Sequence, residues 1–299
     1  MSTIEYDIVG DVHDRADLLH DLLRLLGYDR KLGIWQHAEQ RKAIFVGDMI
    51  HGGGQTQQTI DTIRGMVDSG NAFAILGNHE INVLHHYRRD PQGKPLRELS
   101  PRQWLSHEDT YVNFVLRHPE KWNQILDWFE TLPLWLDFGV LRVVHACWHE
   151  ASMRKLRANR MTQELLCLTA HESSQRRALA NITKGPTIPS LWEEDERPQR
   201  LAWWLPTKQG IRFLNVSLEH FADLVGDSIL SQEELSYTYE SDEPLLFVGH
   251  YNHLQHPQAA ILAHNIVCVD HGVKTLGTLC AYRWRIGQQV SPDHFCAVG

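Results

Sequence analysis

The hydrophobic pattern of the chain is dominated by short apolar runs, each of which stops at a polar residue able to bind a metal ion. Runs of this length, rich in β-branched and aromatic residues, are typical of strands buried on both faces. The run at residues 6–10 stops at Asp11 and His13, and the run at residues 44–47 stops at Asp48. Four further runs stop in the same way, at Asn78, His145, His250 and Asp270.

Helical patterns separate the first of these runs. Apolar residues at helical spacing occupy residues 16–26 and 56–69, and Gly27 and Gly70 follow as terminators. The alternation of strand and helix predicts an α/β fold with largely parallel central strands. Because ligands bind at the carboxyl ends of such strands, we expect the six polar stops to converge on one crevice.

The later part of the chain follows a different pattern. A polar loop is expected over residues 91–102, followed by helices over residues 109–116 and 120–131. The strand pattern then breaks off between about residues 150 and 243. We interpret this segment as a cap inserted into a single domain of residues 1–299, since substrate-selecting elements often lie in such connections. More scaffold is the alternative.

The residue types at the strand ends fit two divalent cations. Asp11 and His13 could face one ion, and Asp48 could bridge two ions with its two oxygens. The amide of Asn78 and the imidazoles of His145 and His250 would complete the second ion's shell. Two ions about 3.5–4 Å apart suit in-line displacement at phosphorus.

Two residues beside Asn78 have other predicted roles. His79 is unable to reach the same ion easily and is placed to protonate a leaving oxygen. Glu80 could orient His79 or hold the structure around it, and Asp270 could bind an ion or hold a residue that does.

These motifs together resemble the five successive blocks of the calcineurin-like metallophosphoesterases. The blocks are Gly10-Asp11-Val12-His13, Val46-Gly47-Asp48, Gly77-Asn78-His79-Glu80, Val144-His145 and Gly249-His250. Within that superfamily the order is similar to the phosphoprotein-phosphatase branch, which includes bacterial Ser/Thr phosphatases, symmetrical diadenosine tetraphosphate hydrolases and the phosphatase domains of bacterial polynucleotide kinase-phosphatases. The resemblance implies a four-layer αββα sandwich, two mixed β-sheets flanked by helices, with the dinuclear metal site at the strand ends.

The resemblance also implies the cofactor and the reaction. Two divalent ions are expected, manganese foremost, with iron, zinc, nickel or magnesium as alternatives. A hydroxide that bridges the two ions would attack phosphorus directly, without a phosphoenzyme.

The second block departs from the family pattern Gly-Asp-x-x-Asp-Arg-Gly. His51 stands where an aspartate would pair with the acid His79, and Gly52 stands where a phosphate-binding arginine is usual. We therefore predict His79 and His51 as the catalytic pair. In the first block Asp14 replaces the usual glycine. Another cation must then neutralise the phosphate, and the candidates are Lys184, Arg177, Arg176 and Arg15.

Three functions remain open at this point. The first is hydrolysis of phosphomonoesters, on a small molecule or a phosphoprotein. The alternative is hydrolysis of dinucleoside polyphosphates of the diadenosine tetraphosphate type. The third is a metal-binding scaffold whose catalysis has weakened, as His51 and Gly52 could hint.

Composition narrows the partners and the compartment. A net charge of −8 disfavours a nucleic-acid polymer, because such binding depends on Lys and Arg. Five cysteines without paired spacing predict reduced thiols. The chain lacks a signal-like start and an apolar run of the ~20 residues that a membrane helix needs. We expect a cytoplasmic protein without membrane contact, whose oligomeric state the sequence leaves open.

Overall fold

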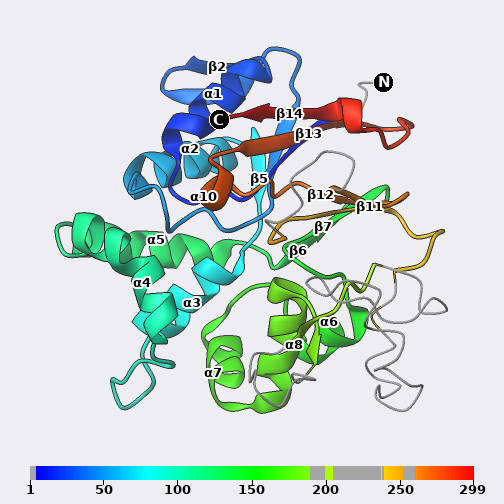
Figure 1. Ribbon diagram of the computed structural model, residues 1–299. Helices are drawn as coiled ribbons and strands as arrows, with labels where there is room; N and C mark the ends of the chain where they lie inside the picture. The colour runs from blue at the N-terminus through cyan, green and yellow to red at the C-terminus, as the bar shows by residue number, and fades with distance from the viewer. Residues whose placement is uncertain (1–4, 189–198, 205–236, 238, 252–259) are drawn as a thin grey trace.

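Two five-stranded β-sheets stacked face to face form the centre of the molecule in the computed structural model (Figure 1). The structure describes residues 5–188, 199–204, 237, 239–251 and 260–299. The first sheet has the order β14 (Phe295–Val298), β13 (Leu279–Arg285), β1 (Glu5–Val9), β4 (Lys42–Phe45) and β5 (Ala72–Ala74). The second has the order β11 (Ile261–Ala263), β12 (Ile266–Cys268), β10 (Leu245–Val248), β7 (Leu141–Val144) and β6 (Trp135–Asp137).

Both sheets are mixed. Strands β1, β4 and β5 run parallel, as do β7, β10 and β12, whereas β13, β14, β6 and β11 pair antiparallel to their neighbours. The polar stops that follow the six parallel strands therefore lie at the same end of each sheet.

The central strands are apolar on both faces because each face packs on a different layer. Ile8, Ile44 and Phe247 belong to the core between the sheets, whereas Val9 and Phe45 belong to the larger core beneath the helices. All five side chains are fully buried. Burial on both sides explains why these strands are continuous apolar runs rather than alternating ones.

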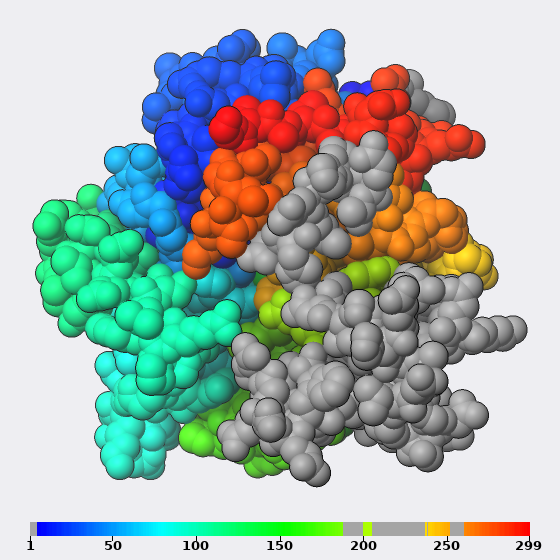
Figure 2. Space-filling view, viewed as in Figure 1, coloured from blue at the N-terminus to red at the C-terminus, as the bar shows by residue number. Residues whose placement is uncertain are grey.

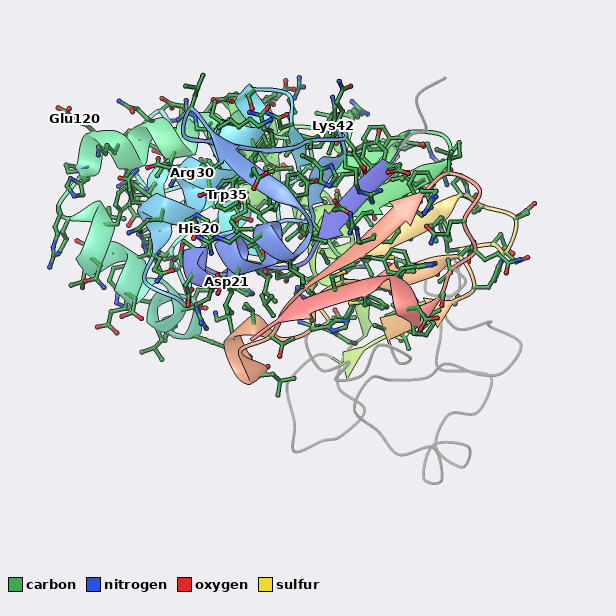
Figure 3. All side chains as sticks on the ribbon, turned by 90° about the horizontal axis from the view of Figure 1, so that it is seen from above. His20, Asp21, Arg30, Trp35, Lys42 and Glu120 are labelled. Atoms are coloured by element: carbon green, nitrogen blue, oxygen red, sulfur yellow. The ribbon has the colours of Figure 1, made fainter. Side chains whose placement is uncertain are left out.

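Helices α1 (Ala16–Leu25) and α2 (Thr56–Asp68) cover the outer face of the first sheet, α1 against β13 and β14 and α2 against β5. A hairpin of β2 (Tyr28–Lys31) and β3 (Ile34–His37) extends this layer. Its Trp35 ring lies 5.4 Å from the ring of His20 on α1, an arrangement that Figure 3 shows. The Arg24 guanidinium lies over the same Trp35 ring at 5.6 Å.

The remaining elements lie mostly on the opposite side of the sheets, below them in Figure 1. They are α3 (Asn78–Tyr87), α4 (Pro101–Thr110), a π-helical turn (Tyr111–Val115), α5 (Pro119–Thr131), α6 (Glu150–Leu156), α7 (Gln163–His171), α8 (Ser173–Lys184) and the short strands β8 (Thr187–Ile188) and β9 (Gln199–Arg200). The short helix α10 (Val273–Leu276) and a 3₁₀ turn (Pro292–His294) complete the described elements. The predicted architecture, two mixed sheets flanked by helices, is confirmed.

Some predicted boundaries were wrong. Helix α4 begins at Pro101, inside the expected loop, and its start is fixed by Ser100, which accepts a hydrogen bond from the N–H of Gln103. Only His107 and Thr110 of this helix are buried, so it carries almost no apolar periodicity. Helix α3 and the β2–β3 hairpin were not expected.

The segment expected to form a cap lies between two neighbouring strands, β7 and β10. Its described part contains α6, α7 and α8, of which α8 packs on both others. Residues 189–198, 205–236 and 238 of that segment lie outside the described residues. The inserted cap and the single domain stay predictions. Within the described part, no helix is long and apolar enough to cross a membrane.

A pH-dependent loss of stability is expected from His85. It is 2% exposed on α3, and its Nε2 lies 2.9 Å from Oγ1 of Thr169 on α7. Burial, together with Arg97, lowers the pKa of His85 to about 3. The fold thus favours the neutral ring, so the unfolded chain binds more protons below about pH 6.5 and stability falls with falling pH.

Urea unfolding at pH 7 and pH 5 measures this loss. His85→Gln should lose about 2 kcal/mol less than the parent protein over that interval. His171→Gln, at an exposed position of α7, is the matched control and should keep the parent pH dependence. Equal losses in the parent and in His85→Gln would contradict the assignment.

Candidate metal centre

The polar residues at the strand ends meet where the two sheets approach each other. Asp11, Asp48 and Asn78 follow β1, β4 and β5, while His145 and His250 follow β7 and β10. The approach is close: a Cβ on Gly249 would lie 2.2 Å from Oδ1 of Asp11. Backbone N–H of His250 lies 3.2 Å from the other oxygen, Oδ2, and donates a hydrogen bond to it. The two sheets are thus joined through the site itself.

In the part of the chain that the structure describes, two groups of nitrogen and oxygen atoms are compact enough to hold a metal ion. One contains His13, Asp48 and His79, the other Asp48, His145 and His250, and the atoms of each group lie within 4.8 Å of one another. Asp48 belongs to both groups: its Oδ2 lies 3.3 Å from Nε2 of His145 and 3.7 Å from Nε2 of His79. Asp11 lies beside the first group, with Oδ2 3.9 Å from Nε2 of His13.

The imidazole rings are oriented by backbone carbonyls. Nδ1 of His145 lies 2.7 Å from the carbonyl oxygen of Val46, and Nδ1 of His13 lies 3.2 Å from that of Ile50. A carbonyl only accepts, so each Nδ1 carries the proton and Nε2 keeps a lone pair that faces the group. Nε2 of His250 is buried and has no hydrogen-bond partner among the described residues. These nitrogens suit a borderline divalent cation.

Asn78 points into the second group. Its amide lies 2.8 Å from Nδ1 of His250 and 3.3 Å from the carbonyl oxygen of Thr183. With the amide nitrogen on this side, Asn78 donates to both acceptors. With the oxygen on this side, Nδ1 of His250 would carry the ring proton and donate it to the amide oxygen, which leaves Nε2 of His250 with a lone pair.

The charges of the site also favour a cation. Burial raises the pKa of Asp11 well above its usual range, and Asp270 and Asp48 raise it further. Burial opposes ionisation of Asp48 too, but His145 and His79 hold its pKa well below the ordinary value. Buried carboxylates that raise one another's pKa are relieved by a bound positive charge.

The imidazoles are held in the form that binds metal. Burial, reinforced by His79, lowers the pKa of His13 to about 3, and burial lowers that of His79 to about 4. Burial also acts to lower the pKa of His145, but the charge of Asp48 and its contact with the ring outweigh burial and leave that pKa raised. Neutral His13 keeps the lone pair that coordination requires.

Glu80 braces the site rather than facing either group. Its two carboxylate oxygens accept hydrogen bonds from four backbone N–H groups, those of Asp48, Met49, Ile50 and Gly77, at 2.8–3.2 Å. Glu80 is fully buried, and burial together with Asp48 raises its pKa to about 7. Asp270 is also buried, and its Oδ1 accepts a 2.9 Å bond from the N–H of Gly272.

The backbone of the site is strained. Among the described residues, eight other than glycine have positive φ, and five of these belong to the site. They are His13 (48°), Asp14 (59°), Asp48 (47°), His51 (75°) and His250 (65°). Left-handed conformations at non-glycine residues are costly and concentrate where function requires them.

A chain of four side chains leads away from the site. Nδ1 of His79 lies 2.7 Å from Nδ1 of His51, and Nε2 of His51 lies 2.8 Å from Nδ1 of His107. Nε2 of His107 lies 2.8 Å from the hydroxyl of Tyr87. The pair of His79 and His51 was expected, whereas His107 on α4 and Tyr87 at the end of α3 were not. Neither carries a spacing signal in the sequence.

Asp14 holds the loop that carries His51. Its Oδ2 accepts hydrogen bonds from the N–H of His51 at 2.8 Å, from the Thr56 hydroxyl at 2.9 Å and from the Thr110 hydroxyl at 3.1 Å. Asp14, which stands where glycine is usual, therefore ties α2 and α4 to His51, which stands where aspartate is usual.

The candidate phosphate-binding cations lie in different places. Lys184, the last residue of α8, lies close enough to the site to be affected by its charge: burial and Arg97 lower the pKa of Lys184, whereas Asp48 raises it. Arg200 on β9 was not predicted. Burial is the main cause of the lowered pKa of His250, and the charge of Arg200 is the next largest. Arg15 pairs with Asp17 at 2.9 Å near the surface.

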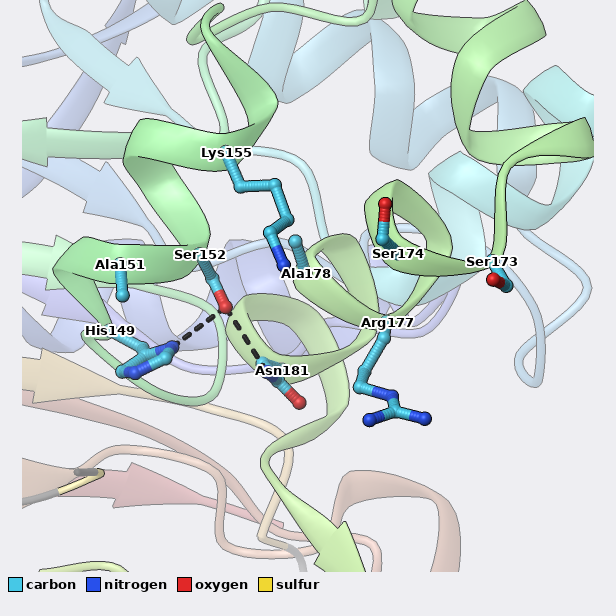
Figure 4. Close-up of a pocket in the computed structure, with 9 residues that line it drawn as sticks. All are labelled: His149, Ala151, Ser152, Lys155, Ser173, Ser174, Arg177, Ala178 and Asn181. Atoms are coloured by element: carbon cyan, nitrogen blue, oxygen red, sulfur yellow. Dashed lines mark hydrogen bonds between the residues drawn. The ribbon is translucent and has the colours of Figure 1, made fainter. Parts of the chain in front are cut away.

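The other two candidates lie on α8 itself. Arg176 donates to the carbonyl oxygen of Ala170 at 2.6 Å and so caps the end of α7. Arg177 lines a separate cavity of about 270 Å³ between α6 and α8 (Figure 4). Ser152 and Lys155 also line this cavity, and none of its lining residues belongs to the two metal-binding groups. The structure therefore places neither arginine at the site.

Comparisons with known proteins agree with this geometry. Residues 6–276 match the family model described as calcineurin-like phosphoesterase. The asymmetrical bis(5'-nucleosyl)-tetraphosphatase PrpE of Oceanobacillus iheyensis is 32% identical over 147 residues, 48% of this chain and 55% of that protein. PrpE of Bacillus subtilis is 31% identical over 143 residues, 47% of this chain and 57% of that protein. The match thus spans about half the length of these curated relatives.

A solved structure shows the same fold. The chain superposes on a cold-active protein tyrosine phosphatase with a TM-score of 0.51 and 16% sequence identity, covering 95% of this chain and 79% of the other. At this identity the similarity concerns the fold alone.

Replacing the Glu80 carboxylate should destabilise the protein. In Glu80→Gln, an amide NH₂ would face backbone N–H groups, leaving buried donors unpaired at a cost of about 2–4 kcal/mol. Urea unfolding of the metal-free protein measures this loss without involving the metal. Glu120→Gln, on the exposed side of α5, is the control and should change stability little. A Glu80→Gln variant as stable as the control would disprove the bracing role.

Proposed function

Because the chain belongs to the calcineurin-like phosphoesterase family, we propose that it hydrolyses a phosphoanhydride bond of a dinucleoside polyphosphate such as diadenosine tetraphosphate. The observation that supports this substrate is the similarity to asymmetrical bis(5'-nucleosyl)-tetraphosphatases, at 32% and 31% identity. Phosphomonoester hydrolysis, the function that the sequence alone favoured, has less support. Small nucleotides are the proposed partners.

The residues at the strand ends fit a pair of divalent cations. We assign Asp11, His13, Asp48, Asn78, His145 and His250 as the ligands. Asp270 would hold the side chain of Asp11 through a hydrogen bond between the two carboxyl groups, and Glu80 would hold the turn that carries Asp48. Manganese is the proposed metal, with iron, zinc, nickel or magnesium as alternatives. When bound, such ions activate water and neutralise phosphate oxygens.

The cations beside the two groups would hold the polyphosphate. Lys184 lies close enough to Asp48 for the two to affect each other's protonation, and Arg200 lies close enough to His250. A tetraphosphate chain carries several negative charges, so dispersed cations suit it better than one bidentate contact would.

His79 is placed to donate a proton to the leaving oxygen. If the Tyr87 hydroxyl donates to His107, each ring in turn donates to the next, and the chain ends by donating to Nδ1 of His79. The proton of neutral His79 then lies on Nε2, 3.7 Å from Oδ2 of Asp48. The chain would thus fix the Nε2–H tautomer of His79, whereas an aspartate would favour the Nδ1–H form. As Nε2 gives its proton to the leaving oxygen, Nδ1 would take one from His51, which would regain it through His107 from Tyr87.

Replacing Asp48 should abolish turnover. We expect manganese-dependent hydrolysis of diadenosine tetraphosphate to exceed that of p-nitrophenyl phosphate, and Asp48→Asn to lower kcat about 100-fold or more. Asp61→Asn, at an exposed position of α2, is the control. Preference for p-nitrophenyl phosphate would favour a phosphomonoesterase. Absence of turnover with two metals bound would favour the weakened scaffold.

Removing the Tyr87 hydroxyl should affect proton donation selectively. Tyr87→Phe keeps the ring contact with Trp122, at 5.4 Å between centroids, and removes the donor at the end of the chain. We expect phenyl phosphate hydrolysis to slow about tenfold and p-nitrophenyl phosphate hydrolysis to change less, since the second leaving group needs less protonation.

One further measurement and one control variant separate this role of Tyr87 from a structural one. The ¹⁵N shifts of the His79 ring in metal-free protein report its tautomer and should change in Tyr87→Phe. Tyr111→Phe, in the neighbouring π-helical turn, should leave both shifts and rates as in the parent protein. Unchanged His79 shifts in Tyr87→Phe would contradict the proposed direction of the chain.

A further inference from the structure

Gly52 leaves a space at the position where the family pattern has an arginine. Its φ is +139°, a conformation that residues with side chains rarely adopt. The neighbouring His51 has its ring turned towards His79 and His107. Neither residue therefore supplies a cation to the mouth of the site from this loop.

The side chain of Lys274 lies over Gly52. A Cβ built on Gly52 would lie 3.2 Å from Cε and 3.3 Å from Cγ of Lys274, tighter than most real Cβ contacts. The lysine stem therefore occupies the space that a side chain on residue 52 would enter. Lys274 belongs to α10, which begins three residues after Asp270 at the end of the second sheet. Lys274, from the C-terminal part of the chain, thus contacts the loop that carries His51 and Gly52.

Lys274 is held at its end and remains accessible. Its Nζ donates a 3.0 Å hydrogen bond to Oγ of Ser106 on α4. The residue is exposed, and α10, orange in Figure 2, lies at the surface beside the green helices of residues 101–131. Among the described residues, no carboxylate lies within ion-pair distance of Lys274. The ammonium is therefore positioned by a neutral hydroxyl and keeps its charge available for a ligand.

The field of this ammonium reaches the catalytic groups. Although the residue as a whole is exposed, partial desolvation of the ammonium lowers the pKa of Lys274, whereas Asp48 and Asp14 raise it, so its charge lies near both carboxylates. In return Lys274 helps to lower the pKa of His51 and of His79, after burial in each case. An anion held by Lys274 would therefore lie beside the site that contains Asp48 and His79.

We propose that Lys274 is a further phosphate-binding cation of this site, placed by Ser106 in the space that Gly52 leaves open. The proposal rests on the phosphoesterase function proposed above and adds a residue that binds its substrate. A lysine is a point charge on a flexible stem, whereas arginine forms a planar pair of hydrogen bonds. The exchange suits a polyphosphate whose bound phosphate group has neighbours on both sides, because no bidentate alignment is imposed.

Helix α4 supports the site at both positions where the second block departs from the family pattern, His51 and Gly52. Ser106 binds Lys274 above Gly52, and the next residue, His107, binds His51. Thr110, one turn later, binds the Asp14 carboxylate that holds the N–H of His51. The residues that replace the usual aspartate and arginine thus share one supporting element.

Steady-state kinetics with diadenosine tetraphosphate, and with inorganic phosphate as inhibitor, test the proposal. Lys274→Met keeps the stem and removes the charge, so KM and the inhibition constant of phosphate should rise about tenfold or more, with kcat less affected. Lys274→Arg should restore most of the affinity, and Ser106→Ala should cause a smaller rise. Lys31→Met, exposed in the β2–β3 hairpin, should match the parent protein.

A binding measurement separates this inference from the proposed function. Calorimetric titration of inorganic phosphate into the metal-loaded parent and Lys274→Met proteins, with metal content measured for both, needs no turnover. Weaker phosphate binding by Lys274→Met at equal metal content would support the role of Lys274 even if no dinucleoside polyphosphate were cleaved. Equal KM, equal inhibition and equal phosphate affinity in the two proteins would overturn it, whatever the parent protein hydrolyses.

Discussion

The Glu80 carboxylate, buried and hydrogen-bonded to four backbone N–H groups, is the interaction on which the site geometry depends. Three of these N–H groups belong to the turn after β4, and the fourth is that of Gly77 after β5. One carboxylate therefore fixes the ends of two adjacent strands. Asp48, the residue common to both metal-binding groups, stands on the turn that it holds. This placement explains how Asp48 keeps a positive φ of 47°.

The proposed metal ligands also require the two sheets to approach each other closely. Four of the six proposed metal ligands follow strands of the first sheet and two follow strands of the second, so the sheet ends must lie within the span of a pair of ions. A Cβ on Gly10 would lie 2.1 Å from the carbonyl oxygen of Val269, across the boundary between the sheets. The apolar core between the sheets supplies the hydrophobic free energy that holds buried carboxylates and imidazoles together.

The departures from the family pattern form one connected region rather than scattered changes. Asp14, His51 and Gly52 differ from the usual residues, and α4 contacts or supports all three positions through Thr110, His107 and Ser106. The two groups of residues compact enough to hold a metal ion lie beside this region. A neutral chain ending at Tyr87 replaces a carboxylate, and an ammonium from α10 enters the space of a guanidinium.

The sequence by itself determined the two sheets and the residues at their strand ends. An apolar run that stops at Asp48 or His145 is a local pattern, and parallel strands place such stops at one edge. Only the tertiary structure decided which residues from other parts of the chain contact the strand ends and the loops beside them. Lys274 meets Gly52, and His107 meets His51, because distant elements pack there, and no spacing in the chain records those contacts. The roles of Glu80 and Arg200 depended on packing for the same reason. Burial and partners, which set the charge state of each group, exist only once the chain has folded.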